Sequence, residues 1–210
     1  CIRDREYIAS PLLWGIHVAD SSPYTKEEDL KGKTAAISRF GSGSHLMAFV
    51  HSRQKRWPLK NLGFEVVHTL EGAVEALTSA KADYFMWEKF TTQPLVDQGI
   101  FRRIGVCPTP WPCFVIGGTK AIASEHPGVL KAILEIINVY TLEFRQIPSI
   151  DRTLANRYQQ ELEAIREWMS LTRWSQDQLS TEVLEKVIDT LDDLNLLSNE
   201  GNVRDLLWKP

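Results

Sequence analysis

The sequence predicts an α/β fold, and three observations lead to this prediction. Up to about residue 118, short segments rich in β-formers alternate with stretches of helical periodicity. Strands alternating with helices of this length indicate a parallel sheet with right-handed crossover connections. After Thr119 the pattern becomes helical throughout, and the composition is that of an ordinary globular protein.

The composition limits the class of protein. The chain has 210 residues, 43% of them hydrophobic and 24% charged, with a formal net charge of −3. This length allows one large or two small domains and needs no metal or disulfide to fold. The mild negative charge gives no electrostatic footprint for nucleic acid or an anionic membrane. The most apolar stretch, 129–142, contains Lys131 and Glu135 and is too short for a membrane span.

The first elements follow in order from the N-terminus. Residues 7–19 are apolar and β-rich with one proline, which indicates an extended strand or crossover segment. Thr25 to Glu28 fits a capping box for a short helix. A strand is predicted over 33–39, and a Gly/Ser turn at 40–45 then leads into an amphipathic helix that opens at Leu46 and runs to about Arg56.

The same alternation continues through the middle of the chain. The predicted strands are 64–68, 83–87, 101–106 and 111–117, and the predicted helices are 70–80 and 89–98. A Pro-rich bend precedes the last strand.

Three helical regions are predicted at the C-terminal end. The stretch 127–144 is apolar on nearly every side, so we expect it to be buried. Ser175 to Gln178 fits a capping box before the last helix. The apolar stripes of the second and third helices are Leu154, Tyr158, Leu162, Ile165 and Met169, and Leu184, Val187, Ile188, Leu191 and Leu194.

The turn Gly41-Ser42-Gly43-Ser44 is the first candidate for ligand contact. It lies between a strand and a helix, where free backbone N–H groups and the helix dipole attract an anion or a carbonyl, and the two serines could add hydroxyl donors. A tight turn with a serine N-cap would explain it equally well. The third glycine of a dinucleotide fingerprint and the Gly-Lys-Ser/Thr of a phosphate loop are both missing.

Trp87 and Glu88, at the end of a predicted strand, form the second candidate. Ligands of open α/β sheets bind beyond the carboxyl ends of strands, where an indole can stack and a carboxylate can accept a donor. The alternative is a half-buried Trp beside a solvated Glu. Arg39 and His45 flank the Gly/Ser turn and could be either ligand contacts or surface and capping residues.

Other reactive residues give weaker signals. The five histidines contain no metal-binding pair, and no catalytic triad can be recognised from residue order, so neither a metal site nor a catalytic residue is predicted. Cys1, Cys107 and Cys113 fit structural thiols better than a disulfide or a functional site. The remaining tryptophans are most simply core or hinge residues: Trp14, Trp111, Trp168, Trp174 and Trp208.

Several stretches together resemble the type II periplasmic-binding-protein fold, in particular its sulfonate and thiamine-pyrimidine-precursor branch with fungal and bacterial binding-protein-like relatives. The stretches that carry this resemblance are Ser10–Trp14, Asp29–Lys33, Ser38–His45, Ala82–Phe90, Pro108–Phe114 and the His126-Pro-Gly helix start. The resemblance covers nearly the whole chain, and the order and spacing of the stretches are more specific than any one of them.

The resemblance implies a two-lobed α/β architecture in which the chain crosses between lobes twice. Residues 18–106 would form lobe II, and residues 1–17 and 107–210 would form the crossing segments and the mostly helical C-terminal part of lobe I. Two βα units would precede Tyr7, so the chain looks N-terminally truncated by roughly 70–90 residues.

The resemblance also implies a pocket and a function. The expected function is capture of a small polar or zwitterionic solute by closure of the cleft between the lobes, without catalysis or a cofactor. The alternatives are an enzyme of the thiamine-pyrimidine-precursor type, whose cysteine motif is not matched at 107–113, and a truncated fragment that binds nothing. A bacterial member would be periplasmic and serve an ABC importer, whereas a fungal member would be cytoplasmic. The expected ligand-binding residues are Ser10, Trp14, Arg39, Gly41, Ser42, Gly43, Ser44, His45, Trp87, Glu88, Pro110 and Trp111.

Overall fold

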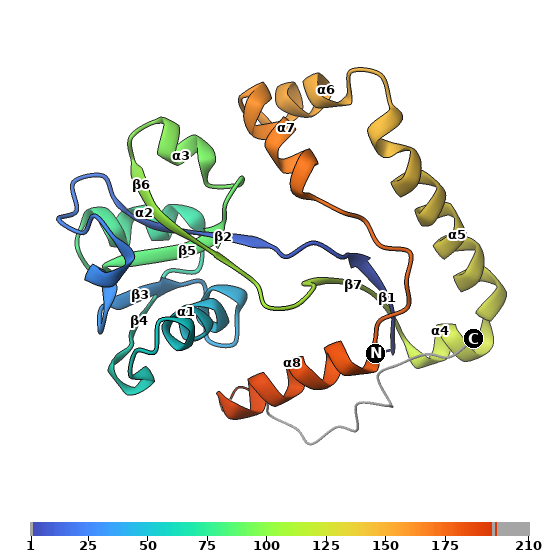
Figure 1. The fold of residues 1–210 in the computed structure, drawn as a ribbon, viewed down its shortest axis with the longest axis horizontal. Helices are drawn as coiled ribbons and strands as arrows, with labels where there is room; N and C mark the ends of the chain where they lie inside the picture. Colours follow the sequence, from blue (N-terminus) through green and yellow to red (C-terminus); the bar gives the residue numbers. More distant parts are fainter. Residues whose placement is uncertain (1, 195, 197–210) are drawn as a thin grey trace. The chain divides into compact units, whose positions relative to one another are not determined.

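The computed structural model describes residues 2–194 and residue 196 (Figure 1). The chain divides into two units. Unit 1 consists of Cys1–Pro11 and Pro110–Pro210, and unit 2 is the continuous segment Leu12–Thr109. Each unit is described by itself below.

A five-stranded sheet forms the centre of unit 2. Its order is β4-β3-β5-β2-β6, and its strands are β2 (Leu13–Ala19), β3 (Thr34–Ile37), β4 (Gly63–Val66), β5 (Tyr84–Glu88) and β6 (Phe101–Pro108). β3 pairs in parallel with β4 and β5, as the alternating pattern predicts. β2 runs antiparallel to β5 and β6, so the prediction of a parallel sheet holds for β3, β4 and β5 and fails for the pairings of β2 with β5 and β6. The reason is that β2 leads the chain into the unit and β6 leads it out at the same end.

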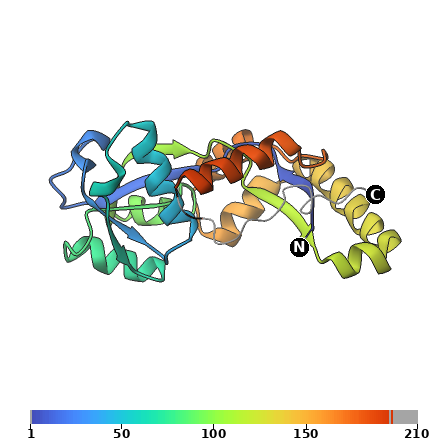
Figure 2. The same ribbon diagram turned by 90° about the horizontal axis from the view of Figure 1, so that it is seen from below.

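Helices cover both faces of this sheet. α1 (Gly43–Gln54) packs on one face, and α2 (Leu70–Thr78) and α3 (Gln93–Asp97) pack on the other (Figure 2). The core under α2 and α3 is built around two fully buried rings, Phe85 and Phe101, and five alanines that let the helices approach closely. Burying each large apolar side chain stabilises the unit by about 1.5–3 kcal/mol.

Two short 3-10 helices complete unit 2, η1 (Glu27–Leu30) and η2 (Leu59–Asn61). The predicted capping box at Thr25 and Glu28 is displaced by one residue. Instead, the Asp29 carboxylate accepts the backbone N–H groups of Thr25 and Lys26 at 2.9 and 3.2 Å. α1 begins at Gly43, three residues earlier than predicted, because Ser42 caps it.

Unit 1 contains a two-stranded antiparallel sheet of β1 (Ile2–Ile8) and β7 (Phe114–Gly118). Isolated bridges join Arg5 to Gln178 and Ile8 to Trp174. The predicted extended segment 7–19 is therefore the end of β1 and the whole of β2, in two different units. The helices of unit 1 are α4 (Lys120–Glu125), α5 (Pro127–Glu143), η3 (Phe144–Gln146), α6 (Ile150–Tyr158), α7 (Leu162–Leu171) and α8 (Thr181–Asp193).

The helix predicted around 154–169 is in fact two helices. α6 ends before Gln159, whose φ of 51° breaks the helix, and α7 starts at Leu162. The capping box predicted at Ser175 is also wrong, because the Ser175 hydroxyl accepts the Asp177 N–H. Ser180 caps α8 by accepting the Val183 N–H at 3.2 Å.

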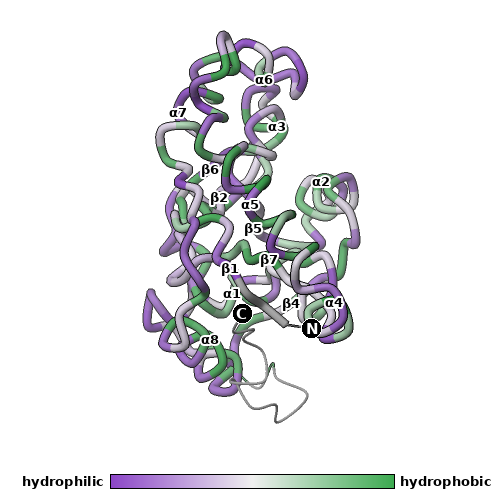
Figure 3. Tube along the Cα trace, turned by 90° about the vertical axis from the view of Figure 1, so that its right-hand side faces the viewer, coloured by the Kyte–Doolittle hydropathy of each residue, from purple (hydrophilic) through white to green (hydrophobic). Residues whose placement is uncertain are grey.

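The predicted burial of residues 127–144 is wrong as well. α5 is one of the segments that carry many hydrophobic residues (Figure 3). Only its Leu134 is buried, and several of its apolar side chains are exposed. These side chains are between 48% and 68% exposed: Val129, Ile133, Ile136, Val139, Tyr140 and Leu142. The helix is apolar on nearly every side, but the described residues cover only one side of it.

Candidate ligand-binding site

The Gly/Ser turn lies at the carboxyl end of β3 and forms the start of α1. The Ser42 hydroxyl accepts the His45 N–H at 3.3 Å, which makes Ser42 the N-cap of the helix. The Ser44 hydroxyl accepts the Ser38 N–H at 3.0 Å and lies 3.0 Å from the Ser42 hydroxyl. Both serine side chains are buried. They therefore hold the turn in shape, and their oxygens are not open to a ligand.

His45 and Arg39 contribute differently to this turn. The His45 Nδ1 accepts the Gly41 N–H at 3.1 Å, so the ring proton is on Nε2. Burial lowers the pKa of His45, which keeps the imidazole neutral. The Arg39 side chain is exposed, and its carbonyl accepts the Ser42 N–H at 3.2 Å. Of the two, only the Arg39 guanidinium is open to an anion in solution.

The backbone N–H groups of Gly43 and Ser44 are the free donors of the turn. The first N–H groups of a helix have no acceptor within the helix. Among the described residues these two amides find none elsewhere, whereas the N–H groups of Gly41, Ser42 and His45 are all taken. Together with the helix dipole they present a positive end to the space beyond β3.

Trp14 lies next to these amides, and Trp87 packs against Trp14. The Trp14 ring packs so closely on Gly43 that a Cβ at that position would be 2.8 and 3.0 Å from two ring carbons. The Trp87 ring lies edge-on to Trp14, with centroids 6.2 Å apart and planes at 75°. Beneath it, Phe85 stacks on Trp87 at 5.3 Å and 18°. The helix start is thus bordered by aromatic faces, and position 43 has room only for glycine.

Glu88 follows Trp87 and faces the next turn. Its carboxylate accepts the backbone N–H groups of Phe90 and Thr91, at 3.1 and 2.6 Å, and the Thr91 hydroxyl at 2.8 Å. These bonds fix the carboxylate at the end of β5. A carboxylate has about four lone-pair positions, so it can still accept one further donor.

The structure thus brings together the predicted residues Trp14, Gly41 to His45, Trp87 and Glu88 within unit 2. Arg39 is also in unit 2, on the exposed side of the turn. The other predicted residues, Ser10, Pro110 and Trp111, belong to unit 1 and stay predictions for this site. The Ser10 hydroxyl accepts the Arg173 N–H at 3.0 Å, the Pro110 carbonyl accepts the Lys186 ammonium at 3.2 Å, and Trp111 is buried.

Phe85, which supports Trp87, is not among the predicted site residues. The strand alternation contains a signal for it, because Phe85 and Trp87 are two apart and share one face of β5.

The chain enters and leaves unit 2 at neighbouring points. The Leu12 N–H donates to the Thr109 hydroxyl and the Thr109 N–H donates to the Leu12 carbonyl, both at 3.0 Å. Pro11 and Pro110 come directly outside this pair in the sequence. Two bonded residues flanked by prolines therefore define the two points where the units are joined.

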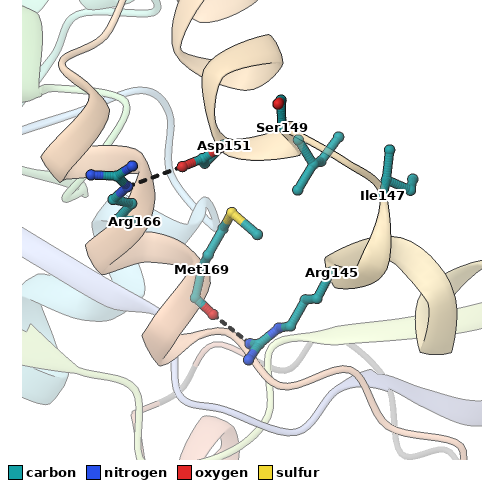
Figure 4. A pocket seen from close by; sticks show the side chains of 7 residues that line it. Arg145, Ile147, Ser149, Asp151, Arg166 and Met169 are labelled. Atoms are coloured by element: carbon teal, nitrogen blue, oxygen red, sulfur yellow. Dashed lines mark hydrogen bonds and ion pairs between the residues drawn. The ribbon is translucent and has the colours of Figure 1, made fainter.

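A hollow of about 310 Å³ lies in unit 1, between η3, α6 and α7 (Figure 4). At one side Arg166 pairs with Asp151 at 3.0 Å, and at the other Arg145 donates to the carbonyls of Met169 and Thr172. Both guanidinium groups are thus engaged in holding the helices together. None of the predicted site residues lines this hollow.

Several other kinds of site find no support among the described residues. No group of three or more His, Cys, Asp or Glu side chains there could hold a metal ion. The helices of the described part are too short or too polar to cross a membrane. Cys107 is a free thiol, and the Cys113 thiol donates to the Trp111 carbonyl at 3.8 Å. Cys1 and Trp208 lie outside the described residues.

Comparison with known proteins connects this arrangement to a fold. Residues 14–107 match the family described as Ca3427-like periplasmic binding proteins. The Candida albicans CA3427 structure, described as having the generic periplasmic-binding-protein fold, aligns with a TM-score of 0.83. It shares 22% identity, over 96% of this chain and 69% of the other. The chain has the periplasmic-binding-protein fold.

Binding proteins from bacteria show the same fold. The aliphatic sulphonate-binding protein SsuA of Escherichia coli aligns with a TM-score of 0.69 and 17% identity, over 98% of this chain and 70% of the other. SsuA of Xanthomonas axonopodis pv. citri, bound to MOPS, aligns with a TM-score of 0.75 and 15% identity, over 97% and 74%. The desulfurization enzyme DszB also aligns, with a TM-score of 0.57 and 14% identity. No curated protein matches the sequence.

Proposed function

We propose that the protein binds a small polar or zwitterionic solute at the start of α1. The observation that carries this proposal is the pair of unpartnered N–H groups on Gly43 and Ser44, bordered by Trp14 and Trp87 at the carboxyl ends of β3 and β5. Ligands of α/β sheets bind at this edge. The names of several proteins with the same fold, which describe binding of sulfonates, support a binding role.

Each part of the site suits one part of such a ligand. The two amides and the helix dipole favour an anionic or carbonyl group. The indole faces of Trp14 and Trp87 favour a flat or aliphatic body, and the remaining lone pairs of Glu88 favour an amine or hydroxyl donor. In the proposed mechanism unit 1 closes over the ligand by bending at Pro11 and Pro110, and the ligand stabilises the closed population.

The proposed role needs no catalytic group from this chain. A reactive thiol would favour the enzyme alternative, but burial raises the pKa of Cys107 to about 12, and its thiol donates to Gln54. A buried thiol of this kind is a poor nucleophile. We therefore place binding ahead of catalysis.

A thermal-shift screen of the 210-residue chain tests the proposal, with MOPS, taurine, thiamine, pyridoxal phosphate and glycine betaine as probes. A ligand present at 100 times its Kd stabilises a protein by about 2.7 kcal/mol, which is easily measured. We expect at least one probe to raise the melting temperature in a saturable manner. If none does at millimolar concentration, the binding proposal is wrong for this chain.

Matched variants locate the site of any probe that binds. Trp87→Ala should weaken binding at least tenfold, while Trp57→Ala, which removes an indole from outside the site, should not. Glu88→Gln removes the charge but keeps only one of the two oxygens that accept the Phe90 and Thr91 amides. A loss of affinity that is larger for a cationic probe than for a neutral one therefore reports contact with a cationic ligand group. Unchanged affinity in both Trp87→Ala and Glu88→Gln would exclude this end of β5 from the site.

A further inference from the structure

A buried polar network lies behind the Trp87–Glu88 strand end. His17 in β2 is fully buried. Its Nε2 lies 2.9 Å from the Thr92 hydroxyl and 3.3 Å from the Arg103 Nε, and its Nδ1 lies 3.3 Å from the Phe85 carbonyl. Arg103 continues the network, because its two terminal nitrogens donate to the Gln93 side chain at 2.8 Å and the Lys89 carbonyl at 2.7 Å.

These contacts define the proton positions. The Phe85 carbonyl can only accept, so the His17 Nδ1 carries the ring proton. The Arg103 Nε–H can only donate, so the His17 Nε2 must accept. The Thr92 hydroxyl lies 2.9 Å from the same Nε2 and also donates to the carbonyls of Glu88 and Lys89, at 3.1 and 3.2 Å, so it joins His17 to the turn that follows β5. His17 is therefore a neutral ring with every polar atom engaged, and burial followed by Arg103 lowers its pKa to about 3.

Two features of the backbone make room for this arrangement. A side chain at position 15 would collide with the His17 ring, since a Cβ there would be 2.4 Å from the imidazole and 3.0 Å from the Arg103 Nε. The β2–β6 pairing is also irregular between Ile16 and His17, so that His17 faces Arg103 directly. Such bulges re-aim side chains near functional sites. Gly15 itself pairs with Trp87 on β5.

The network reaches the proposed site along two routes. The first runs through Phe85, whose carbonyl is bonded to His17 and whose ring stacks under Trp87. The second runs through the turn 89–93, which Thr92 and Arg103 hold and on which the Glu88 carboxylate is seated through the Phe90 and Thr91 amides. Trp87, through Phe85, and Glu88, through the 89–93 turn, are therefore both held by the same His17 network.

We infer that His17, Thr92 and Arg103 are positioning residues of the ligand site, which hold Trp87 and Glu88 in place before any ligand arrives. This inference rests on the proposed function for its biological meaning, but the mechanical coupling it describes can be measured without a ligand. The network contacts no solute itself and acts through Phe85 and the 89–93 turn.

The test compares Thr92→Val with Thr92→Ser in the full chain. Valine keeps the shape of threonine but loses the hydroxyl that joins His17 to the Glu88 and Lys89 carbonyls, whereas serine keeps the hydroxyl. Hydrogen exchange is measured at the Phe90 and Thr91 amides, together with the near-ultraviolet circular dichroism of the Trp14–Trp87 pair. We expect Thr92→Val to speed exchange at these two amides at least tenfold and to reduce the tryptophan signal, and Thr92→Ser to leave both unchanged.

Exchange at the Val67 amide, which follows the edge strand β4, serves as the internal reference for a general loss of stability. A Thr92→Val variant in which exchange rises equally at Val67 would show a merely structural role and overturn the inference, as would unchanged exchange at Phe90 and Thr91. If Thr92→Val fails to fold, Arg103→Lys provides the second variant, because lysine keeps the charge and loses the fork that reaches Gln93 and Lys89. Where MOPS binds, Thr92→Val should weaken it several-fold. If no probe of the thermal-shift screen binds, that result counts against the proposed function alone, because the exchange and circular dichroism measurements need no ligand.

Discussion

At the scale of single residues, most of the candidate site follows from local chemistry. The strand–Gly/Ser–helix pattern correctly predicts a helix after the Gly/Ser turn, although α1 begins at Gly43 and not at Leu46, and the strand end predicts the place of Trp87 and Glu88. The pattern does not show which groups the serine hydroxyls of the turn bond to. Ser42 and Ser44 could bind a ligand or cap a helix, and only the contacts with His45 and Ser38 show that they do the latter. The contact of Trp14 with Gly43 is equally hidden, because it joins residues far apart in the chain.

The buried histidine of unit 2 should make stability depend on pH. His17 has a pKa of about 3 in the folded chain and about 6.5 when unfolded. Between these values the unfolded chain binds a proton that the folded chain does not, so the free energy of unfolding falls as the pH drops below 6.5 and is fully retained above it. The His17 share of this slope is up to about 1.4 kcal/mol per pH unit.

Urea unfolding of wild type and His17→Gln from pH 7.5 to 4.5 measures this share. His45 and His51, whose pKa values burial also lowers, contribute to the slope in both proteins. We expect the wild type to lose stability more steeply than the variant below pH 6.5. Parallel curves would mean that His17 is protonated in the folded protein.

At the scale of elements, the periodicity of the sequence predicts whether a helix or strand is present better than it predicts how buried that element is. Every predicted strand and helix of unit 2 has a counterpart in the structure, although α3 is shorter than the predicted helix 89–98. In unit 1 the apolar stripe from Leu154 to Met169 keeps its helical spacing across a break, so the sequence pattern predicts one helix. The structure has two helices, because the backbone at Gln159 is left-handed. α5 shows the other limit. Apolar residues lie on nearly every side of this helix, which predicts burial. The periodicity of the sequence does not show which of these residues other parts of the chain cover.

The exposed face of α5 should therefore tolerate charge. Ile136 is 56% exposed, so Ile136→Asp should change the free energy of unfolding by less than about 1 kcal/mol and lower the fluorescence of bound ANS. Leu134→Ala, on the buried side of the same helix, should cost about 2–5 kcal/mol. Chemical unfolding and ANS titration of both variants make the comparison. A loss for Ile136→Asp as large as that for Leu134→Ala would show that this face is packed in solution.

At the scale of the whole molecule, the α/β class and the binding-protein fold are confirmed, and most of the information lies in the order of the elements. The expected lobe boundaries, 18–106, are not tested by the comparisons and remain a prediction beside the observed division at Leu12 and Thr109. The prediction of a parallel sheet fails at β2, because residue patterns do not reveal the direction of this strand. That direction depends on where the chain enters and leaves unit 2, which is a property of topology.

The hydrogen-bonded pair of Leu12 and Thr109 gives unit 2 the character of an insertion. Because its two ends are neighbours, the rest of the chain loses little by its removal and the unit needs no distant strand to close its sheet. We therefore expect that this segment can be expressed on its own, circularly permuted or inserted into a loop of another protein. Residues 12–109 expressed alone should unfold in one cooperative step and keep the circular dichroism of the Trp14–Trp87 pair. A fragment without a cooperative transition would show that unit 1 supplies part of its stability.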